Sequence, residues 1–319
     1  MIDRRTFIAS VSAVCAASVM PAQAQSNLVR LVVPLTPGTT PDTIARVMSP
    51  VLQKQLGAAI VVENKPGASG MIGMKSVAQS TDVGMLMVVP ATTVTLPHFY
   101  TKMDFDVLKS FAPITRVASS SFVLVVGNNV KVGNLSEFTD WVKSHPGSFY
   151  ASPGNGTHHH LFMEMLLQSL GVKLEHVPYK GSGPALNDVM AGLVPTMFLP
   201  IQVAVPLRDA GRLKIIGGSL RDRHPGFPEI PSLQELGAKN YHADPWFAVW
   251  GSPKIPDELA EKYRAAFEFA MDDPGVKGNL TKQGLILKSS SPAELLRLSK
   301  EESDMWTRVI QTAKIKPEE

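Results

Sequence analysis

Short apolar runs alternate with longer helix-like stretches along the chain, and this alternation constrains the fold more than any other feature of the sequence. Runs such as 59–64 (AIVVEN) and 122–127 (FVLVVG) have the length of strands, are rich in β-branched residues and are apolar on both faces. Strands of this kind, separated by helices, predict mostly parallel sheets covered by helices, which is an α/β fold. After the N-terminal segment about 295 residues remain, enough for two domains.

The predicted elements follow from this pattern and from local stop and start signals. Ser291, Pro292 and Glu294 form the sequence of a capping box and predict the start of the last helix. The predicted strands are 28–34, 59–64, 85–90, 122–127, 149–152, 174–179, 194–200, 213–218 and 247–253. The predicted helices are 41–56, 70–80, 135–144, 158–170, 183–192, 202–210, 231–236, 256–271 and 292–312.

The first 24 residues predict a cleaved export signal. Arg4 and Arg5 precede an uncharged, mostly apolar run, and Ala22 and Ala24 have the small side chains of a cleavage site. The two arginines also resemble a twin-arginine signal, so the general secretory route and the twin-arginine route both stay open; an uncleaved anchor is the alternative. Cys15, the only cysteine, lies in this segment, so the mature chain is expected to have neither disulfide nor thiol chemistry.

The charge balance excludes some partners. The chain has 31 basic and 28 acidic residues, a net charge of +3, with no basic surface pattern that would indicate nucleic-acid binding. No stretch after residue 24 is long and apolar enough to cross a membrane. We therefore expect an exported, soluble globular protein.

Loops that leave the carboxyl ends of strands are the candidate ligand sites, because ligands of open α/β sheets bind at that edge. The first such loop, 33–42, combines rigid backbone with hydroxyl groups ahead of a helix, whose first N–H groups suit an anion. An ordinary capped loop is the alternative. Its candidate residues are Thr36, Pro37, Gly38, Thr39, Thr40 and Asp42.

Two further loops have similar chemistry. Thr92 and Thr93 follow a buried strand, where their hydroxyls could bind a ligand oxygen or cap the next turn. In the other loop glycines allow close approach of the backbone to a ligand, and a threonine precedes a helix, which together make an anion cradle. Its residues are Gly154, Asn155, Gly156 and Thr157. The place of the third glycine in a dinucleotide fingerprint is taken by His159, so nucleotide binding is rejected.

Three consecutive histidines follow this turn. Neighbouring helical residues are about 100° apart, so His158, His159 and His160 cannot converge on one ion. A helical zinc pair needs a second histidine four residues on, where Phe162 stands instead. We expect His160 to turn inward and support the cradle, with the other two at the surface and no metal bound.

The fourth loop, 197–206, places Phe198 and Leu199 where they could shape an apolar pocket wall. The sequence contains no nucleophile elbow, no Walker loop and no paired catalytic carboxylates. Loops that suit oxyanions, without a nucleophile and its base, indicate a binding site rather than an enzyme. No cofactor is expected.

At these loops the sequence resembles a known family, the Bug (Bordetella uptake gene) proteins, which are the solute receptors of tripartite tricarboxylate transporters. The resemblance covers nearly the whole mature chain and is carried by VPLTPGTTPDTIAR (33–46), VVENKPGASGMIGMKSVAQS (61–80), FDVLKSFAPITRVA (105–118), SPGNGTHHHLFMEML (152–166), HVPYKGSGPALNDVMAGLVPTMF (176–198) and ESDMWTRVIQTAKI (302–315). The pair ENKPGASG and VPYKGSGPAL is its most specific part.

The resemblance implies a periplasmic binding protein fold of type II, with two α/β lobes and a ligand cleft between them. Lobe 1 would combine 25–125 with 247–319, and lobe 2 would span 126–246. In the family, a ligand carboxylate lies between the first strand–helix loop and the helix behind the glycine turn. Carried over, these are residues 36–42 and 154–157, and Thr92 and Thr93 match a Ser-Thr pair of the family.

Two departures from the family pattern bear on the ligand. The first loop usually reads Pro-Phe-Pro-Pro-Gly-Gly, whereas this chain has PLTPGT at 34–39. The family commonly has Asp where this chain has Leu199, and without that acid a ligand amino group has no obvious partner. We therefore expect a carboxylate with an apolar or aromatic body, rather than an amino acid or citrate.

The resemblance implies a monomeric periplasmic receptor that captures a small carboxylate and delivers it to a membrane permease. One alternative is a receptor of the same fold that reports its ligand to a two-component sensor. The other is a periplasmic metal-dependent enzyme built on the histidines. Metal analysis of the purified protein would distinguish the latter.

Overall fold

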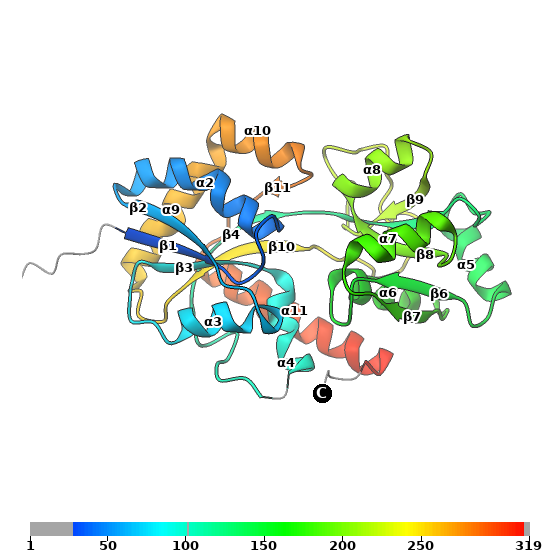
Figure 1. Ribbon diagram of the computed structural model, residues 1–319, viewed down its shortest axis with the longest axis horizontal. Coiled ribbons are helices and arrows are strands. Elements are labelled where there is room, and N and C mark those ends of the chain that lie inside the picture. The colour runs from blue at the N-terminus through cyan, green and yellow to red at the C-terminus, as the bar shows by residue number, and fades with distance from the viewer. Residues whose placement is uncertain (1–27, 101, 316–319) are drawn as a thin grey trace, which may run out of the picture.

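The computed structural model describes residues 28–100 and 102–315, and the predicted export signal, 1–24, lies outside them. Two lobes lie side by side in Figure 1, each built around one sheet. The first sheet has the strand order β11-β4-β10-β3-β1-β2, and the second has the order β7-β6-β8-β5-β9. The strands are β1 (Leu28–Val33), β2 (Ala59–Asn64), β3 (Met85–Pro90), β4 (Ala112–Ser119), β5 (Phe122–Gly127), β6 (Phe149–Ser152), β7 (Glu175–Pro178), β8 (Thr196–Pro200), β9 (Leu213–Gly218), β10 (Trp246–Gly251) and β11 (Ile286–Leu287).

Both sheets are mixed, which corrects the prediction of mostly parallel sheets. In the first sheet β1 is parallel to β2 and β3, whereas β10 runs antiparallel to β3 and β4. In the second sheet β6 is parallel to β7 and β8, whereas β5 runs antiparallel to β8 and β9. Strands β5 and β10 each follow a passage of the chain from one lobe to the other, so they do not belong to the local βαβ units. The short strand β11 also pairs antiparallel, with β4.

Helices cover both faces of each sheet (Figure 1). The helices are α2 (Thr40–Leu56), α3 (Met71–Ala78), α4 (Leu96–Phe99), α5 (Leu135–Ser144), α6 (His158–Leu170), α7 (Ser182–Ala191), α8 (Ile201–Asp209), α9 (Asp257–Asp272), α10 (Pro274–Lys282) and α11 (Pro292–Ala313), with 3-10 turns η1 (Ala68–Gly70) and η2 (Ala91–Thr95). None of the helices in the described ranges is both long and apolar enough to cross a membrane.

One predicted helix, 231–236, is instead a turn. Gly218 forms an isolated bridge with Ser232, whose hydroxyl accepts a hydrogen bond from the Glu235 amide. Arg223 holds the Glu235 carboxylate at 2.6 Å. These contacts hold this short segment as a turn rather than as a helix.

The passage between the lobes lies at residues 120–121, ahead of β5. All of β5 pairs in the second sheet, beginning with Phe122 opposite Pro200. The predicted boundary after residue 125 therefore falls inside a strand of the second sheet. The return passage leads into β10, and the two passages touch where the Ser120 amide donates to the Pro245 carbonyl at 3.1 Å.

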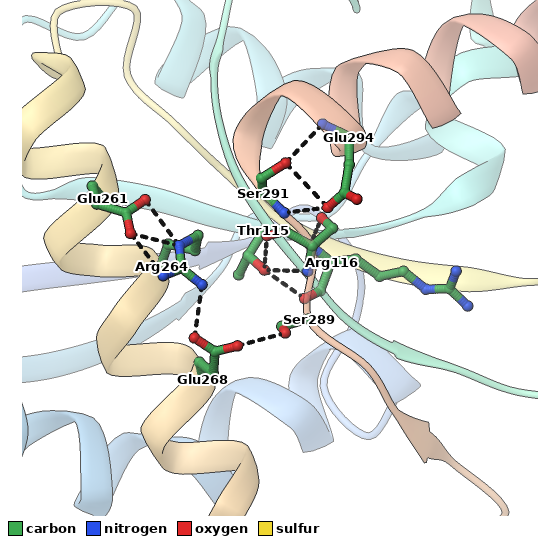
Figure 2. Close-up of polar contacts among 9 residues, drawn as sticks. Thr115, Arg116, Glu261, Arg264, Glu268, Ser289, Ser291 and Glu294 are labelled. Carbon is green, nitrogen blue, oxygen red and sulfur yellow. Dashed lines mark hydrogen bonds and ion pairs between the residues drawn. The ribbon is translucent and has the colours of Figure 1, made fainter.

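The last helix, α11, begins on the first lobe and reaches the second. Figure 2 shows its start, where Ser291 and Glu294 make the predicted capping box. Just before the helix, the carbonyl of Ser290 accepts a hydrogen bond from the Thr115 hydroxyl of β4 at 2.9 Å. Further along, the Gln168 side chain of α6 donates to the Val309 carbonyl of α11 at 3.1 Å. This helix therefore ties the two lobes together.

Candidate functional site

A cavity of about 220 Å³ lies between the lobes. The first lobe contributes most of its wall, from the ends of β1 and β3 and the turns that follow, and the second lobe contributes the turn before α6. The lining residues are Pro34, Leu35, Ser69, Met74, Pro90, Thr92, Thr93, Thr95, Leu96, Phe99, Tyr100, Asn155, Gly156 and Thr157. None of these residues carries a charge. The cavity therefore offers hydroxyl groups, amide groups and apolar surface.

The turn before α6 is organised by its own hydrogen bonds. The Thr157 hydroxyl donates to the Gly154 carbonyl at 2.8 Å and caps α6 by accepting from the His160 amide at 3.5 Å. Gly156 has a φ of 70°, and a Cβ there would lie 2.8 Å from the Phe99 ring of the other lobe. Only glycine allows the lobes to approach this closely. Because a helix leaves its first N–H groups without helical partners, this turn presents donors to the cavity.

His160 turns inward as predicted. Its side chain is 3% exposed, its Nδ1 accepts from the Gly156 amide at 3.1 Å, and its ring stacks on His176 at 3.9 Å. Burial, and then the neighbouring His176, lower the pKa of His160 to about 3. Burial lowers the pKa of His176 to about 4. Both rings are therefore neutral near pH 7, and His160 supports the turn without adding a charge.

The expectation that His158 and His159 lie at the surface is wrong. Both are half-buried, and their rings meet the Phe122 ring edge-on at 5.6 and 4.9 Å. The Nε2 atom of His158 and both ring nitrogens of His159 are sealed from water without a hydrogen-bond partner. The rings pack against the chain just after it crosses between the lobes. Among the described residues, no group of three His, Cys, Asp or Glu side chains could hold a metal ion.

The first loop reaches the cavity through residues that the sequence did not single out, Pro34 and Leu35. The predicted contacts from this loop, at 36–40, lie outside the cavity wall, and the Thr39 hydroxyl donates to the Thr36 carbonyl at 2.9 Å. Their exposure places Thr36, Pro37 and Gly38 at the surface of the first lobe, and Thr39 and Thr40 are half-buried.

Asp42 does not line the cavity but supports the first loop from behind. It is 3% exposed and accepts hydrogen bonds from the Gly38 amide at 2.9 Å, Arg46 at 3.0 Å and Asn64 at 2.9 Å. Burial alone would raise the pKa of Asp42, but the hydrogen bonds from Arg46, Gly38 and Asn64 outweigh it and lower that pKa. Asn64 also donates to the Leu35 carbonyl at 3.2 Å, so this network fixes the loop where it meets the cavity.

Thr92 and Thr93 line the cavity, where the sequence placed them. They lie in η2, and the Thr95 hydroxyl donates to the Thr92 carbonyl at 2.8 Å. Sequence reasoning missed Ser69 and Tyr100, which share the same cavity. Ser69 stands within the quoted ENKPGASG stretch, and this was the one signal that could have found it.

Phe198 and Leu199 do not form a wall of the cavity. They are 0% and 1% exposed, and because they are neighbours on β8 they point into different cores. Phe198 packs edge-on against Phe162 of α6 at 6.2 Å, whereas Leu199 belongs to the core under α7 and α8. The strand reaches Pro200 as predicted, but it buries both side chains, so the expectation that they shape a pocket wall is wrong.

Two α/β lobes that share one uncharged, donor-rich cavity define a bilobal ligand-binding protein. Residues 44–315 match the model of the tripartite tricarboxylate transporter family receptor. The chain belongs to this family of receptors, to which the Bug proteins that it resembles in sequence also belong. A UPF0065 protein of Bordetella pertussis is 31% identical to it, over 98% of this chain and 97% of the relative.

Solved structures show the same fold. The periplasmic binding protein BugD is 26% identical, with a TM-score of 0.76 over 91% of this chain and 99% of its own. MatC of Rhodopseudomonas palustris with bound malate is 28% identical, with a TM-score of 0.75 over 89% and 98%. Rpa4515 of R. palustris with adipate is 27% identical, with a TM-score of 0.79 over 91% and 98%. The predicted α/β periplasmic binding protein fold is confirmed, as is the expectation of a binding protein rather than an enzyme.

Proposed function

We propose that this receptor captures a small organic carboxylate with an apolar or aromatic body in the cavity between its lobes. The observation that carries the proposal is the composition of the cavity wall. The first turn of α6 and the hydroxyls of Thr92 and Thr93 supply donors for a carboxylate, and Thr157 holds that turn in place. Met74, Leu96 and the other apolar lining residues supply the surface for the ligand body.

The absence of charged side chains from this wall argues against other ligand classes. An ammonium group would need a carboxylate partner once it leaves water, and no acidic residue lines the cavity. A compact tricarboxylate such as citrate would gather three negative charges in one place without a cation to balance them. MatC is described with malate and Rpa4515 with adipate, so the related structures hold small carboxylates in the same fold.

We propose that the chain is exported by its N-terminal segment and delivers the bound carboxylate, as a monomer, to the permease of a tripartite transporter. The Gly154–Thr157 turn already faces the first-lobe wall across the cavity, so closing of the lobes on a ligand would enclose it between them. Water would then be excluded, and each charge-assisted hydrogen bond to the ligand would strengthen. In this scheme Asp42 and His160 hold the two loops from behind.

Thr157→Ala is expected to weaken carboxylate binding by about tenfold, because the turn that presents the N–H donors loses the hydrogen bonds of this hydroxyl to the Gly154 carbonyl and the His160 amide. The fold should persist, because losing the helix cap costs about 1 kcal/mol. Calorimetric titration with aliphatic, aromatic and amino-acid carboxylates measures the affinity, and thermal unfolding checks the fold. Thr157→Ser retains the hydroxyl and should bind like the parent. An unchanged dissociation constant for Thr157→Ala would remove Thr157 from the site, and tight binding of aspartate alone would contradict the apolar ligand class.

A further inference from the structure

The turn between β2 and α3 has an unusual backbone. Its four residues, Gly67, Ala68, Ser69 and Gly70, have φ angles of 125°, 45°, 54° and 95°. Two of them are not glycine, and residues with a Cβ rarely adopt this left-handed region. Strained backbone of this kind persists only where the surrounding structure fixes it, and it concentrates at binding sites.

Close packing fixes this turn against the first loop. Gly70 is buried, and a Cβ there would lie 3.1 Å from the Pro34 carbonyl oxygen. A Cβ at Gly73, in the helix that follows, would lie 2.7 Å from the Lys65 carbonyl oxygen and 2.8 Å from the Pro34 side chain. The Gly70 amide closes the turn by donating to the Gly67 carbonyl at 3.0 Å. The turn therefore has little freedom to move, and Ser69 is held at its tip.

The result of this geometry is a pair of hydroxyls on the cavity wall. The Ser69 hydroxyl lies 2.5 Å from the Tyr100 phenol oxygen, and both residues line the cavity. One O–H donates within the pair, so the second O–H is available to a ligand. Both residues belong to the first lobe, whereas Asn155, Gly156 and Thr157 of the carboxylate cradle belong to the second.

We infer that Ser69 and Tyr100 form a second polar anchor that binds the far carboxylate of an elongated dicarboxylate. This inference rests on the proposed function and names the ligand class within it. One carboxylate lies at the α6 turn, the apolar body contacts Met74 and Leu96, and the second carboxylate accepts a hydrogen bond from the hydroxyl pair. The receptor would then select ligands that have a second carboxylate. A ligand without one displaces water from the Ser69 and Tyr100 hydroxyls and leaves their free O–H without an acceptor.

Matched ligands test this anchor. Adipate is compared with hexanoate, which has a methyl group in place of one carboxylate, and terephthalate is compared with p-toluate in the same way. The parent protein should bind the dicarboxylate of a pair more tightly. Ser69→Ala and Tyr100→Phe each remove one hydroxyl and should weaken dicarboxylate binding by about tenfold, while the monocarboxylate changes less than about twofold.

The controls separate the anchor from general damage. Ala68→Gly relaxes the neighbouring strained residue without removing a hydroxyl, so it should leave both affinities of a pair unchanged. Thr157→Ala should weaken both members of a pair. Equal affinity of the parent for both members, or equal loss for both in Ser69→Ala and Tyr100→Phe, overturns the second anchor while the proposed function stands. If no carboxylate binds at all, the proposed function fails, and the anchor fails with it.

Discussion

Replacing Trp306 with alanine is expected to lower the free energy of unfolding by about 3 to 5 kcal/mol, the usual cost of removing a fully buried tryptophan. Trp306 is 1% exposed on α11 and stacks on Phe162 of α6, with ring centroids 5.7 Å apart. Its indole N–H donates to the buried Glu302 carboxylate at 3.0 Å. The substitution leaves a cavity where α11 joins the two lobes and removes a partner from a buried acid.

Trp141→Ala is the matched control for this prediction. Trp141 is half-buried at the edge of the second lobe, where it stacks on His145 at 4.5 Å, so its removal should cost much less. Denaturant unfolding followed by circular dichroism measures both variants. A loss for Trp306→Ala no larger than that for Trp141→Ala would contradict the role assigned to α11.

Acid is expected to destabilise the unliganded protein steeply as the pH falls from about 6.5 towards 4. Burial lowers the pKa of His158, His159 and His160 to about 3, and that of His176 to about 4. In the unfolded chain each of these histidines takes up a proton near pH 6.5, whereas in the folded chain each stays neutral at that pH. The unfolded state therefore binds more protons, and stability is lost as the pH falls through this window.

Glu302 opposes this trend. Burial raises its pKa to about 7, against the indole hydrogen bonds from Trp306 and Trp246 that lower it. The folded chain thus keeps a proton that the unfolded chain releases near pH 4.5, so Glu302 contributes stability that is lost as the pH rises from about 4.5 to 7. One such group offsets one of the four histidines. These five groups together contribute a slope of about 4 kcal/mol per pH unit at its steepest, from about 1.4 kcal/mol per proton.

The double variant His158→Phe/His159→Phe tests the histidine part of this prediction. Their unpartnered rings already pack against Phe122, so phenylalanine suits the same space. Unfolding free energies measured without ligand from pH 8 to pH 5 should show a slope reduced by about two protons. A slope equal to that of the parent would show that these two side chains do not govern acid stability.

The sequence predicted most strands because their signals are local. The strands at 59–64, 122–127 and 213–218 have the predicted bounds, since each is an apolar run with turn residues beside it. In contrast, β4 was missed, because Pro113, Thr115 and Arg116 break its apolar pattern. Those polar residues are explained only by distant partners: Arg116 pairs with Asp244 at 2.6 Å, and Thr115 holds the start of α11 (Figure 2).

The site was predictable to the extent that it follows strand ends. Thr92, Thr93 and the turn before α6 were found because loops at the carboxyl ends of strands gather at one edge. Ser69 was not found, since its place depends on a left-handed turn packed against Pro34. Phe198 and Leu199 were misplaced because an apolar pair at a strand end fits both a pocket wall and a core, and only the packing of α6, α7 and α8 distinguishes the two.

Calorimetric titration of Gly156→Leu beside Gly171→Leu tests the central claim, that a small carboxylate binds between the lobes. Both glycines have a left-handed φ, of 70° and 64°, at opposite ends of α6, so the two variants share the same backbone cost. A side chain at Gly156 meets the Phe99 ring in the cavity, whereas one at Gly171 meets nothing within 4 Å. We expect Gly171→Leu to bind the carboxylate that the parent binds, and Gly156→Leu to bind none. Equal affinities in the two variants, or no binding of any carboxylate by the parent, would contradict the claim.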